Sequence, residues 1–244
     1  MSLNAMEQKL LALLTPNTST PIARIAKSLY VSEATARRYV NTLAERGVVI
    51  RTHGGCMPSD RMLDANTPMY IRFANGQRDK QCIARRAAEM IPQGATVFLD
   101  SSSTAFQIVP YLRPDQGLTL ITSGLKTATA LAEMNLRVMC LGGTVHTANQ
   151  SMNSAFAVEA IGQFHADLFF FSCDALSDEG EITDNSYEES LLRKAFMRRA
   201  QQKVLLLDAQ KRGRRCKYHL CTLEEIDACI TNEGEEAILL PCNA

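Results

Sequence analysis

The chain has 244 residues, of which 46% are hydrophobic and 21% charged, enough length and apolar content for a globular core. No stretch reaches the roughly 18 apolar residues that a membrane-spanning helix needs, and we expect a cytoplasmic protein. The net charge is zero but uneven, because residues 1–55 carry seven Lys or Arg against three Glu, a net +4, which leaves −4 for residues 56–244. This asymmetry predicts that only the first segment contacts nucleic acid.

The first 31 residues contain two amphipathic patterns. Apolar residues recur at helical spacing in 6–14 and again in 22–29. Thr20 is a suitable N-cap for the second helix, whose first residue would be Pro21, where the missing amide proton costs nothing. Only Tyr30 and Val31 separate this helix from the next N-cap at Ser32, so the spacing predicts a helix-turn-helix.

A third helix is expected after Ser32, whose hydroxyl can accept from the first-turn amides. Its apolar stripe starts at Ala36 and continues at helical spacing to Ala44, and Gly47 ends it. The opposite face has small and hydroxyl side chains followed by two arginines, which suits the DNA major groove, although paired arginines are often only a solvated face. A strand at 48–50 and a basic turn at 51–55 complete a winged helix-turn-helix. The candidate DNA-binding residues are Ser32, Glu33, Ala34, Thr35, Arg37, Arg38, Asn41, Arg51 and His53.

Residues 31–55 read V-S-E-A-T-A-R-R-Y-V-N-T-L-A-E-R-G-V-V-I-R-T-H-G-G. This stretch resembles the signature of the DeoR family of bacterial transcriptional regulators, V-S-x-x-T-I-R-R-D-L, then L-E-x-x-G and R-x-H-G-G, except that Tyr39 stands where the family has aspartate. The resemblance implies a regulator of double-stranded operator DNA. Repression is the family's common mode, although nothing in these residues fixes the sign. Because operators usually contain paired half-sites, we also expect a homo-oligomer.

After the wing the composition changes, and we expect a winged domain at 1–56, a linker at 57–76 and an effector domain at 77–244. In the last part, helical stretches alternate with short strands that are apolar throughout, which predicts a Rossmann-like, mostly parallel α/β sheet buried on both faces. Strands are expected at 96–99, 118–121, 136–141, 168–172, 204–207, 226–230 and 238–240, and helices at 80–91, 104–112, 125–133 and 188–202.

Ligands of such sheets bind beyond the carboxyl ends of the strands. Three loops there are rich in Ser, Thr and Gly, and two of them run into helix N-termini, where free amides favour an anion. One such turn is commonly only a helix cap, but several at one edge predict a small anionic ligand. Lys211 is a possible countercharge, unless it is a plain surface lysine in a basic turn. The candidate residues are Asp100, Ser101, Ser102, Ser103, Thr104, Thr122, Ser123, Gly124, Gly142, Gly143 and Lys211.

The resemblance extends to this half. The DeoR effector domain resembles ribose-5-phosphate isomerase and glucosamine-6-phosphate deaminase and usually binds a phosphorylated sugar, so a sugar phosphate is the implied effector. Its motifs D-x-G-[ST]-T, T-N-[SG], L-G-G, a helix beginning with glutamate, and D-x-S-K-x-G match 100–104, 122–124, 141–143, 189–193 and 208–213, which adds Glu189 to the site. Ser102 and Ser154 replace glycines of the pattern, Ser123 an asparagine and Gln210 a serine. A lost glycine adds a Cβ near the ligand, so an atypical effector or a vestigial pocket stays open.

The competing interpretation is a sugar-phosphate isomerase or deaminase, which needs a carboxylate or histidine beside its substrate. The candidates by position are Asp174, Asp184, Glu188, Glu189, His146 and His165. None lies in a motif that demands catalysis, and an isomerase has no use for a recognition helix. We therefore expect no catalytic residues, and turnover of pentose or hexose phosphates would overturn that expectation.

Metal and cofactor sites are not expected either. The eight cysteines are scattered, several inside apolar runs such as 138–141, and in a reducing compartment they would pack as small hydrophobic side chains. Cys216 and Cys221 flank His219, but the spacing matches no common zinc pattern and there is no convincing fourth ligand.

Overall fold

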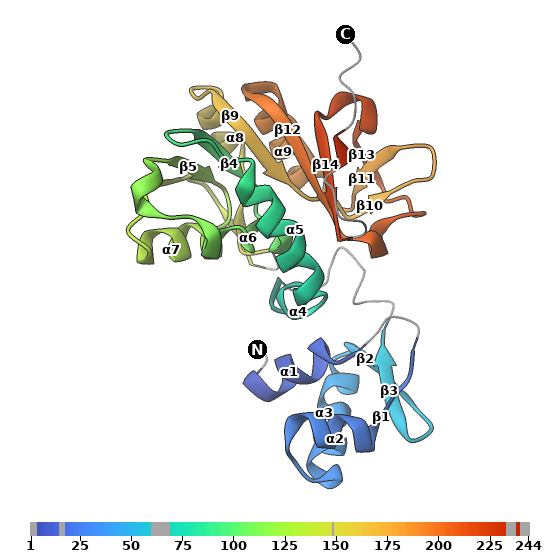
Figure 1. The fold of residues 1–244 in the computed structure, drawn as a ribbon. Helices are drawn as coiled ribbons and strands as arrows, with labels where there is room; N and C mark the ends of the chain where they lie inside the picture. The colour runs from blue at the N-terminus through green and yellow to red at the C-terminus, as the bar shows by residue number, and fades with distance from the viewer. Residues whose placement is uncertain (1–3, 15–17, 60–68, 148, 233–237, 240–244) are drawn as a thin grey trace. The chain divides into compact units, whose positions relative to one another are not determined.

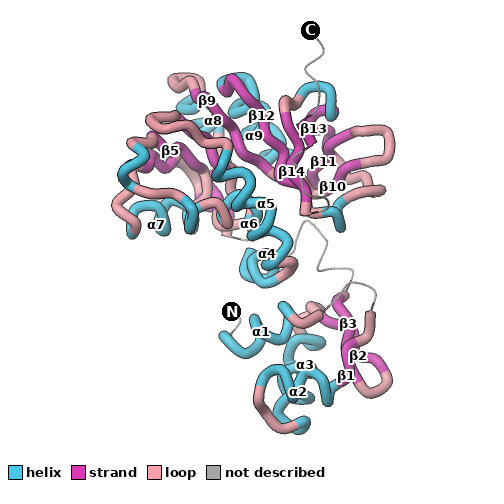
Figure 2. The backbone as a smooth tube through the Cα atoms, in the orientation of Figure 1, coloured by secondary structure: helices cyan, strands magenta, loops and turns pink. Residues whose placement is uncertain are grey.

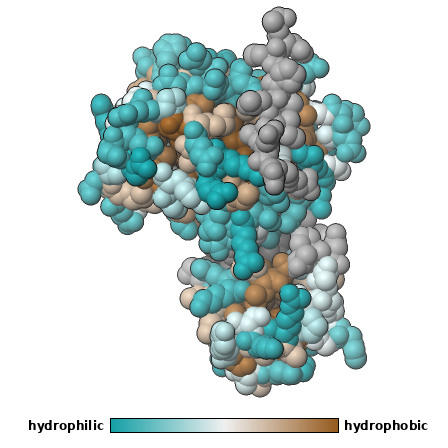
Figure 3. Space-filling view, in the orientation of Figure 1, coloured by the Kyte–Doolittle hydropathy of each residue, from teal (hydrophilic) through white to brown (hydrophobic). Residues whose placement is uncertain are grey.

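The computed structural model describes residues 4–14, 18–59, 69–147, 149–232 and 238–239. The chain divides into two compact units, Met1–Gln77 and Arg78–Ala244, whose helices and strands are shown in Figures 1 and 2. Hydrophilic residues cover most of the face shown in Figure 3, with hydrophobic residues in patches between them. Within the described ranges, no helix has the length and apolar character needed to cross a membrane.

The first unit is a winged helix-turn-helix, as predicted. Helices α1 (Ala5–Ala12), α2 (Ile22–Leu29) and α3 (Glu33–Glu45) bury one apolar face each, and a three-stranded sheet follows in the order β1 (Thr20–Pro21), β3 (Gly55–Pro58), β2 (Val49–Thr52). Helix α4 (Met69–Ala74) also lies in this unit. The core of the first unit contains fully buried side chains of α1, α2 and α3, among them Leu10, Leu11, Ile25 and Leu43.

The two ends of α3 follow the sequence prediction. The Ser32 hydroxyl accepts a hydrogen bond from the Thr35 amide at 3.2 Å and caps the helix. At the other end Gly47 adopts a left-handed conformation with φ of 69°, and the Val48 amide donates to the Leu43 carbonyl at 2.9 Å. This 6→1 bond is the Schellman arrangement that satisfies the last carbonyls of a helix.

Three details of the first unit differ from the prediction. Thr20 does not cap α2, because it pairs with Cys56 in the small sheet, and Pro21 is the N-cap. The basic turn is shorter than expected, since Arg51 lies in β2 and only 53–54 connect the strands. Strand β3 continues to Pro58, which pairs with Val49, so the wing extends into the segment expected to be linker. Residues 60–68 of that segment lie outside the described residues, and helix α4 follows them within the same segment.

The second unit contains the predicted sheet. Seven strands are ordered β15-β14-β12-β9-β4-β5-β6, all parallel except β15. Their bounds are β4 Thr96–Leu99, β5 Thr119–Thr122, β6 Val138–Cys140, β9 Ala166–Phe171, β12 Ala200–Leu207, β14 Ala228–Thr231 and β15 Ile238–Leu239. Helices α5 (Gln77–Glu89) and α7 (Leu125–Glu133) cover one face, while α8 (Ala155–Ile161) and α9 (Tyr187–Arg199) cover the other (Figure 1).

Several elements of this unit were not predicted. Hairpin β7 (Val145–His146) with β8 (Ser151–Met152), helix α8, and the antiparallel sheet β10 (Ala175–Leu176), β11 (Glu181–Asp184), β13 (Tyr218–Thr222) are all additional. These strands are short or partly polar and give little periodicity. Helix α6 (Ser103–Phe106) ends well before residue 112, and Pro110 lies instead in a 3₁₀ helix, Val109–Tyr111.

The expectation of strands buried on both faces is wrong for β6. It is the edge strand of the sheet, so Met139 is 39% exposed and Cys140 is exposed, although the apolar run 138–141 predicted burial. Four cysteines, Cys56, Cys173, Cys221 and Cys229, are buried as expected.

Candidate functional site

The outward face of α3 carries the side chains predicted for DNA contact. Ala34, Arg38 and Asn41 are exposed, on the side of the helix opposite the buried Val40 and Leu43. The other predicted residues of this helix end are also exposed, except for the half-buried Thr35; they are Ser32, Glu33 and Arg37. This face of α3 therefore does not pack in the core of the first unit.

The two arginines of this face differ in their surroundings. Arg37 forms an ion pair with Glu33 one turn earlier, with 3.2 Å between Nη2 and Oε2. Arg38 has no ion-pair partner within the described ranges, and its guanidinium lies 5.9 Å from the ring centroid of Tyr39, a cation–π distance. Arg38 is thus the better candidate for a phosphate or base contact.

The wing turn depends on two glycines with different roles. Gly54 has φ of 84°, a conformation that side chains with a Cβ rarely adopt. Gly55 has ordinary backbone angles, but a Cβ there would overlap the carbonyl oxygen of Thr20 in β1. The predicted wing residues Arg51 and His53 flank this turn and are exposed.

In the second unit the sheet reverses its order between β4 and β9. From β4 the chain continues outward to β5 and β6 on one side, whereas β9, β12 and β14 follow on the other side. Such a switch point leaves a crevice beyond the carboxyl ends of the two central strands. The residues after those strands meet there, because the Ser172 amide donates to Asp100 Oδ2 at 3.1 Å.

The loop after β4 is buried and internally bonded. Asp100 Oδ1 accepts the Ser102 amide at 2.9 Å, and the Ser102 hydroxyl accepts the Ala105 amide at 3.1 Å, which caps α6. Ser103 and Thr104, the first two residues of α6, are 3% and 1% exposed. The Asp100 carboxylate therefore organises the loop itself.

The loop after β5 lies directly against the first one. A Cβ on Gly124 would lie 3.1 Å from the Ser101 Cα, which is tighter than an ordinary contact, so glycine favours this close approach. The Thr122 hydroxyl accepts the Gly124 amide at 3.1 Å, and Ser123 is buried between them. Two of the three predicted loops are thus brought together.

The loop after β6 is more open. Gly142 and Gly143 are exposed, and a Cβ on Gly142 would meet no atom within 4 Å. Gly143 has φ of 129°, and a Cβ there would overlap the Ser154 hydroxyl, which caps α8.

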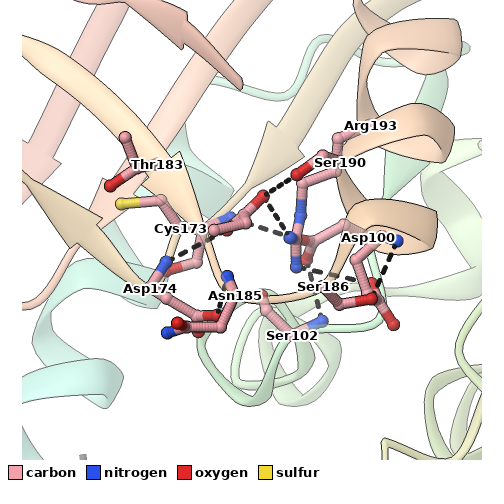
Figure 4. A network of polar contacts seen from close by, with 12 residues as sticks. Asp100, Ser102, Cys173, Asp174, Thr183, Asn185, Ser186, Ser190 and Arg193 are labelled. Carbon is pink, nitrogen blue, oxygen red and sulfur yellow. Dashed lines mark hydrogen bonds and ion pairs between the residues drawn. The ribbon is translucent and has the colours of Figure 1, made fainter. Parts of the chain in front are cut away.

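A buried arginine that was absent from the predicted site lies at the centre of the crevice. Arg193 of α9 donates to Asp100 Oδ2 at 3.0 Å and to Asp184 Oδ2 at 2.7 Å, and its Nη2 lies 3.5 Å from Glu189 Oε2. Figure 4 shows its guanidinium between Asp100 on one side and the segment containing Asp174 on the other. One guanidinium therefore joins three carboxylates from the loop after β4, the end of β11 and α9.

Glu189 collects donors from four further residues. Its Oε2 accepts the Ser101 hydroxyl at 3.0 Å, and its Oε1 accepts Ser151 Oγ at 2.8 Å, Asn153 Nδ2 at 2.6 Å and Asn149 Nδ2 at 3.3 Å. The carboxylate is saturated by the protein, so it positions the surrounding loops.

Lys211 is also drawn to the carboxyl edge. Its Nζ donates to the Ser172 hydroxyl at 2.9 Å and to the Cys173 carbonyl at 2.6 Å. The lysine therefore belongs to the crevice and is not a plain member of a surface basic turn.

The pKa values of two buried carboxyl groups in the crevice are shifted in opposite directions. Burial raises the pKa of Asp184 to about 6, with Asp174 and Glu189 adding to the rise and Arg193 opposing it. Burial also raises the pKa of Glu189, but Arg193 and the donors Asn153, Ser151 and Ser101 outweigh it and leave a net lowering. Glu189 is thus stabilised as the carboxylate anion, whereas the pKa of Asp184 lies closer to neutral pH.

The residues weighed for catalysis are only partly brought together. Asp174 and Asp184 lie at the crevice, since the Asp174 amide donates to Asp184 Oδ1 at 3.1 Å. His165 precedes the first residue of β9, at the opposite edge of the sheet, and its Nε2 is 2.8 Å from Arg199 Nη2. His146 is exposed in β7, and Glu188 is an exposed residue of the first turn of α9.

The residues considered for metal binding lie elsewhere. His219 Nδ1 is 3.1 Å from Glu181 Oε1, Cys216 accepts a hydrogen bond from Asn185, and Cys221 is buried in the core. Across the described residues, no group of three or more His, Cys, Asp or Glu could hold a metal ion.

Comparison with known proteins decides the family. Residues 7–61 match the DeoR-like helix-turn-helix domain, and residues 75–233 match the DeoR C terminal sensor domain. The chain belongs to the DeoR family. Its relatives include the HTH-type transcriptional regulator GolR of Listeria innocua, 31% identical over 93% of this chain and 89% of that protein.

Two Escherichia coli relatives are named for opposite effects on transcription, one as a repressor and the other as an activator. The glycerol-3-phosphate regulon repressor is 28% identical over 83% of this chain and 80% of its own length. The L-fucose operon activator is 27% identical over 97% and 98%. Membership of the DeoR family therefore does not by itself fix repression or activation.

The serines that replace glycines of the DeoR pattern have structural roles here. Ser102 caps α6, and Ser154 accepts the Ala157 amide at 3.3 Å and caps α8. The added Cβ atoms are thus accommodated at helix starts. In this DeoR chain the residues that sequence reasoning missed are Arg193, Ser172, Asn149, Ser151 and Asn153. The available signal was the spacing of Glu189 and Arg193, which share one helix face at i and i+4.

Proposed function

We propose that the chain is a DNA-binding transcriptional regulator whose first unit contacts operator DNA and whose second unit senses a small phosphorylated sugar. The observation that carries the sensor half is the meeting of two Ser/Thr/Gly loops and Lys211 at the switch point of a parallel sheet. Repression, a homo-oligomeric assembly and a cytoplasmic location remain predictions. The regulators named above support the choice of a sensor over an enzyme.

The carboxylates of the crevice also favour a sensor. A general base must reach the proton that it removes. Glu189 is saturated by four donors and Arg193, while Asp100 and Asp184 both accept hydrogen bonds from Arg193. These groups hold the loops in place, which suits binding without turnover. Incubation with pentose and hexose phosphates tests this, and the appearance of product would contradict it.

The DNA half is tested with Arg38→Ala, using DNA selected in vitro for tight binding to the wild-type chain. If Arg38 contacts a phosphate, affinity should fall for all sequences, and the slope of log K against log salt should decrease by about 1. If it binds guanine, discrimination at one base pair should fall by ~1–3 kcal/mol. The ion-paired Arg37 provides a matched control, since Arg37→Ala should have the smaller effect. Unchanged affinity and slope in Arg38→Ala would remove α3 as the recognition helix.

The phosphate half is tested at Gly142, where a side chain fits without contact. Gly142→Asp adds a negative charge beside the loops, and Gly142→Asn adds a neutral side chain of the same size. At ~4 Å in water two unit charges repel by about 1 kcal/mol, so Gly142→Asp should weaken binding of sugar phosphates about fivefold. Gly142→Asn should bind like the wild type in calorimetric titrations. Equal binding by both variants would place the anion away from this loop.

A further inference from the structure

The segment Asn149 to Asn153 presents polar atoms that have no hydrogen-bond partner among the residues that the structure describes. Within these residues, the Asn149 Oδ1 and Asn153 Oδ1 atoms are buried and accept no hydrogen bond, and the same is true of Thr104 Oγ1 at the start of α6. Asn149 is only 7% exposed and Thr104 only 1%. An unsatisfied buried polar atom costs about 1–3 kcal/mol, so each of these three atoms points to a function.

The orientation of the two amides is fixed by Glu189. An ionised carboxylate can only accept hydrogen bonds, so the Nδ2 atoms of Asn149 and Asn153 must face it, at 3.3 and 2.6 Å. Their oxygens therefore point away from the carboxylate. The structure presents two oriented acceptors whose complement must be a hydrogen-bond donor.

Two nearby main-chain amides already donate to other groups. The Met152 amide donates to the Ser123 carbonyl at 2.9 Å, and the Leu125 amide donates to the Gln150 carbonyl at 2.9 Å. These bonds also join the segment to the loop after β5, which lies against the Ser101 loop. The unpartnered acceptors are thus held beside the proposed phosphate loops, and the donors that complete them come from outside the segment.

We propose that Thr104, Asn149 and Asn153 bind the hydroxyl or amino groups of the effector next to its phosphate. This inference rests on the proposed sensor function and narrows its ligand. The effector class is a phosphorylated polyol or amino sugar with donor groups close to the phosphate, and a simple alkyl phosphate lacks the groups that these residues require.

The ligand side is tested by titration calorimetry with the full-length protein. Glycerol 3-phosphate and propyl phosphate share a phosphate but differ in their hydroxyls, and the hydroxylated compound should bind about 3- to 10-fold tighter for each hydrogen bond made. Glucose 6-phosphate, glucosamine 6-phosphate and 2-deoxyglucose 6-phosphate distinguish a hydroxyl from an amino donor. Glycerol and glucose, which lack a phosphate, are titrated as the final comparison.

The protein side uses Thr104→Val, which removes an unpartnered hydroxyl with little change in volume, and Asn153→Leu, which removes an unpartnered oxygen together with the Nδ2 group that donates to Glu189 at 2.6 Å. In both variants the ratio of the affinity for glycerol 3-phosphate to that for propyl phosphate should fall about 3- to 10-fold. Ser151→Ala is the matched control, because Ser151 donates to the same Glu189 oxygen at 2.8 Å but contributes no unpartnered atom. It should keep the preference.

The outcomes separate this inference from the proposed function. If phosphates bind without any preference for hydroxyl or amino groups, the inference is wrong and the phosphate sensor stands. An equal loss of preference in Ser151→Ala and Asn153→Leu would also overturn it, because the effect would then belong to Glu189. If glycerol or glucose binds as tightly as its phosphate, the phosphate function fails, and the inference that rests on it fails as well. If no probe binds at millimolar concentration, both fail.

Discussion

Replacing Arg193 with Met is expected to destabilise the second unit by about 3–5 kcal/mol. The guanidinium is the partner of Asp100, Asp184 and Glu189, all of which are almost fully buried. Removing one member of a buried ionic network leaves the remaining charges desolvated and uncompensated, and such losses have this size. The matched control is Arg198→Met on the exposed side of the same helix, which should change stability by less than about 0.5 kcal/mol.

Hydrogen exchange measured on peptides from β9 and α9 resolves this effect, and protection in α3 of the first unit is an internal reference. The loss should depend on pH. Without the guanidinium, nothing from Arg193 opposes the effect of burial on Asp184 and Glu189, so the pKa of both carboxyls rises. The damage is therefore greatest at neutral pH and shrinks on acidification as these carboxylates become protonated. A loss of protection that is equal at pH 5 and pH 8, or absent at both, would contradict the role assigned to Arg193.

The wild-type second unit should gain stability when the pH is lowered from about 7.5 to about 5. Burial raises the pKa of Asp184 to about 6 in the folded chain, from an ordinary value of 3.8. A group with a raised folded pKa contributes stability that is complete below its unfolded pKa and is lost as the pH rises through the folded one. The gain is on the order of 1–3 kcal/mol. At still lower pH the trend should reverse, because Glu189, whose folded pKa is lowered, contributes stability that is lost as the pH falls.

Asp184→Asn isolates this contribution. The variant cannot titrate at this position, so the rise in stability between pH 7.5 and pH 5 should largely disappear, whatever its stability at neutral pH. Urea unfolding at a series of pH values, with the slope of stability against pH as the readout, decides the point. An unchanged slope in the variant would assign the pH dependence to other groups.

The sequence predicted the architecture well where one physical signal dominates. Helix α3 was predictable because a capping serine, an apolar stripe and a stopping glycine all agree, and the central strands because parallel buried strands are apolar throughout. It failed at β6, where an apolar run forms an edge strand, since composition does not reveal which strand is outermost. The sequence did not predict hairpin β7–β8 or sheet β10–β11–β13, because strands of two to five residues carry too little periodicity.

The crevice could be located from the sequence, but its bonding could not. The rule that ligands lie beyond the carboxyl ends of parallel strands identified the loops at Asp100, Thr122 and Lys211. That the carboxylate of Asp100 faces inward to a buried arginine depends on contacts across 93 positions of the chain. The roles of Asn149 and Asn153 could not be predicted either, because they depend on Glu189, which fixes the direction of both side-chain amides.

The contact between Gly55 and Thr20 has a consequence for how the effector can act. Main-chain atoms join the wing to the start of α2, through this close approach and through the Ile22 amide, which donates to the Gly54 carbonyl at 2.9 Å. Helix α2 in turn packs with α3 in the apolar core of the first unit, so the wing and the recognition helix keep a fixed spacing. We expect the effector to leave base preference within one half-site unchanged and to alter instead how two copies occupy paired half-sites, so that it acts on cooperativity.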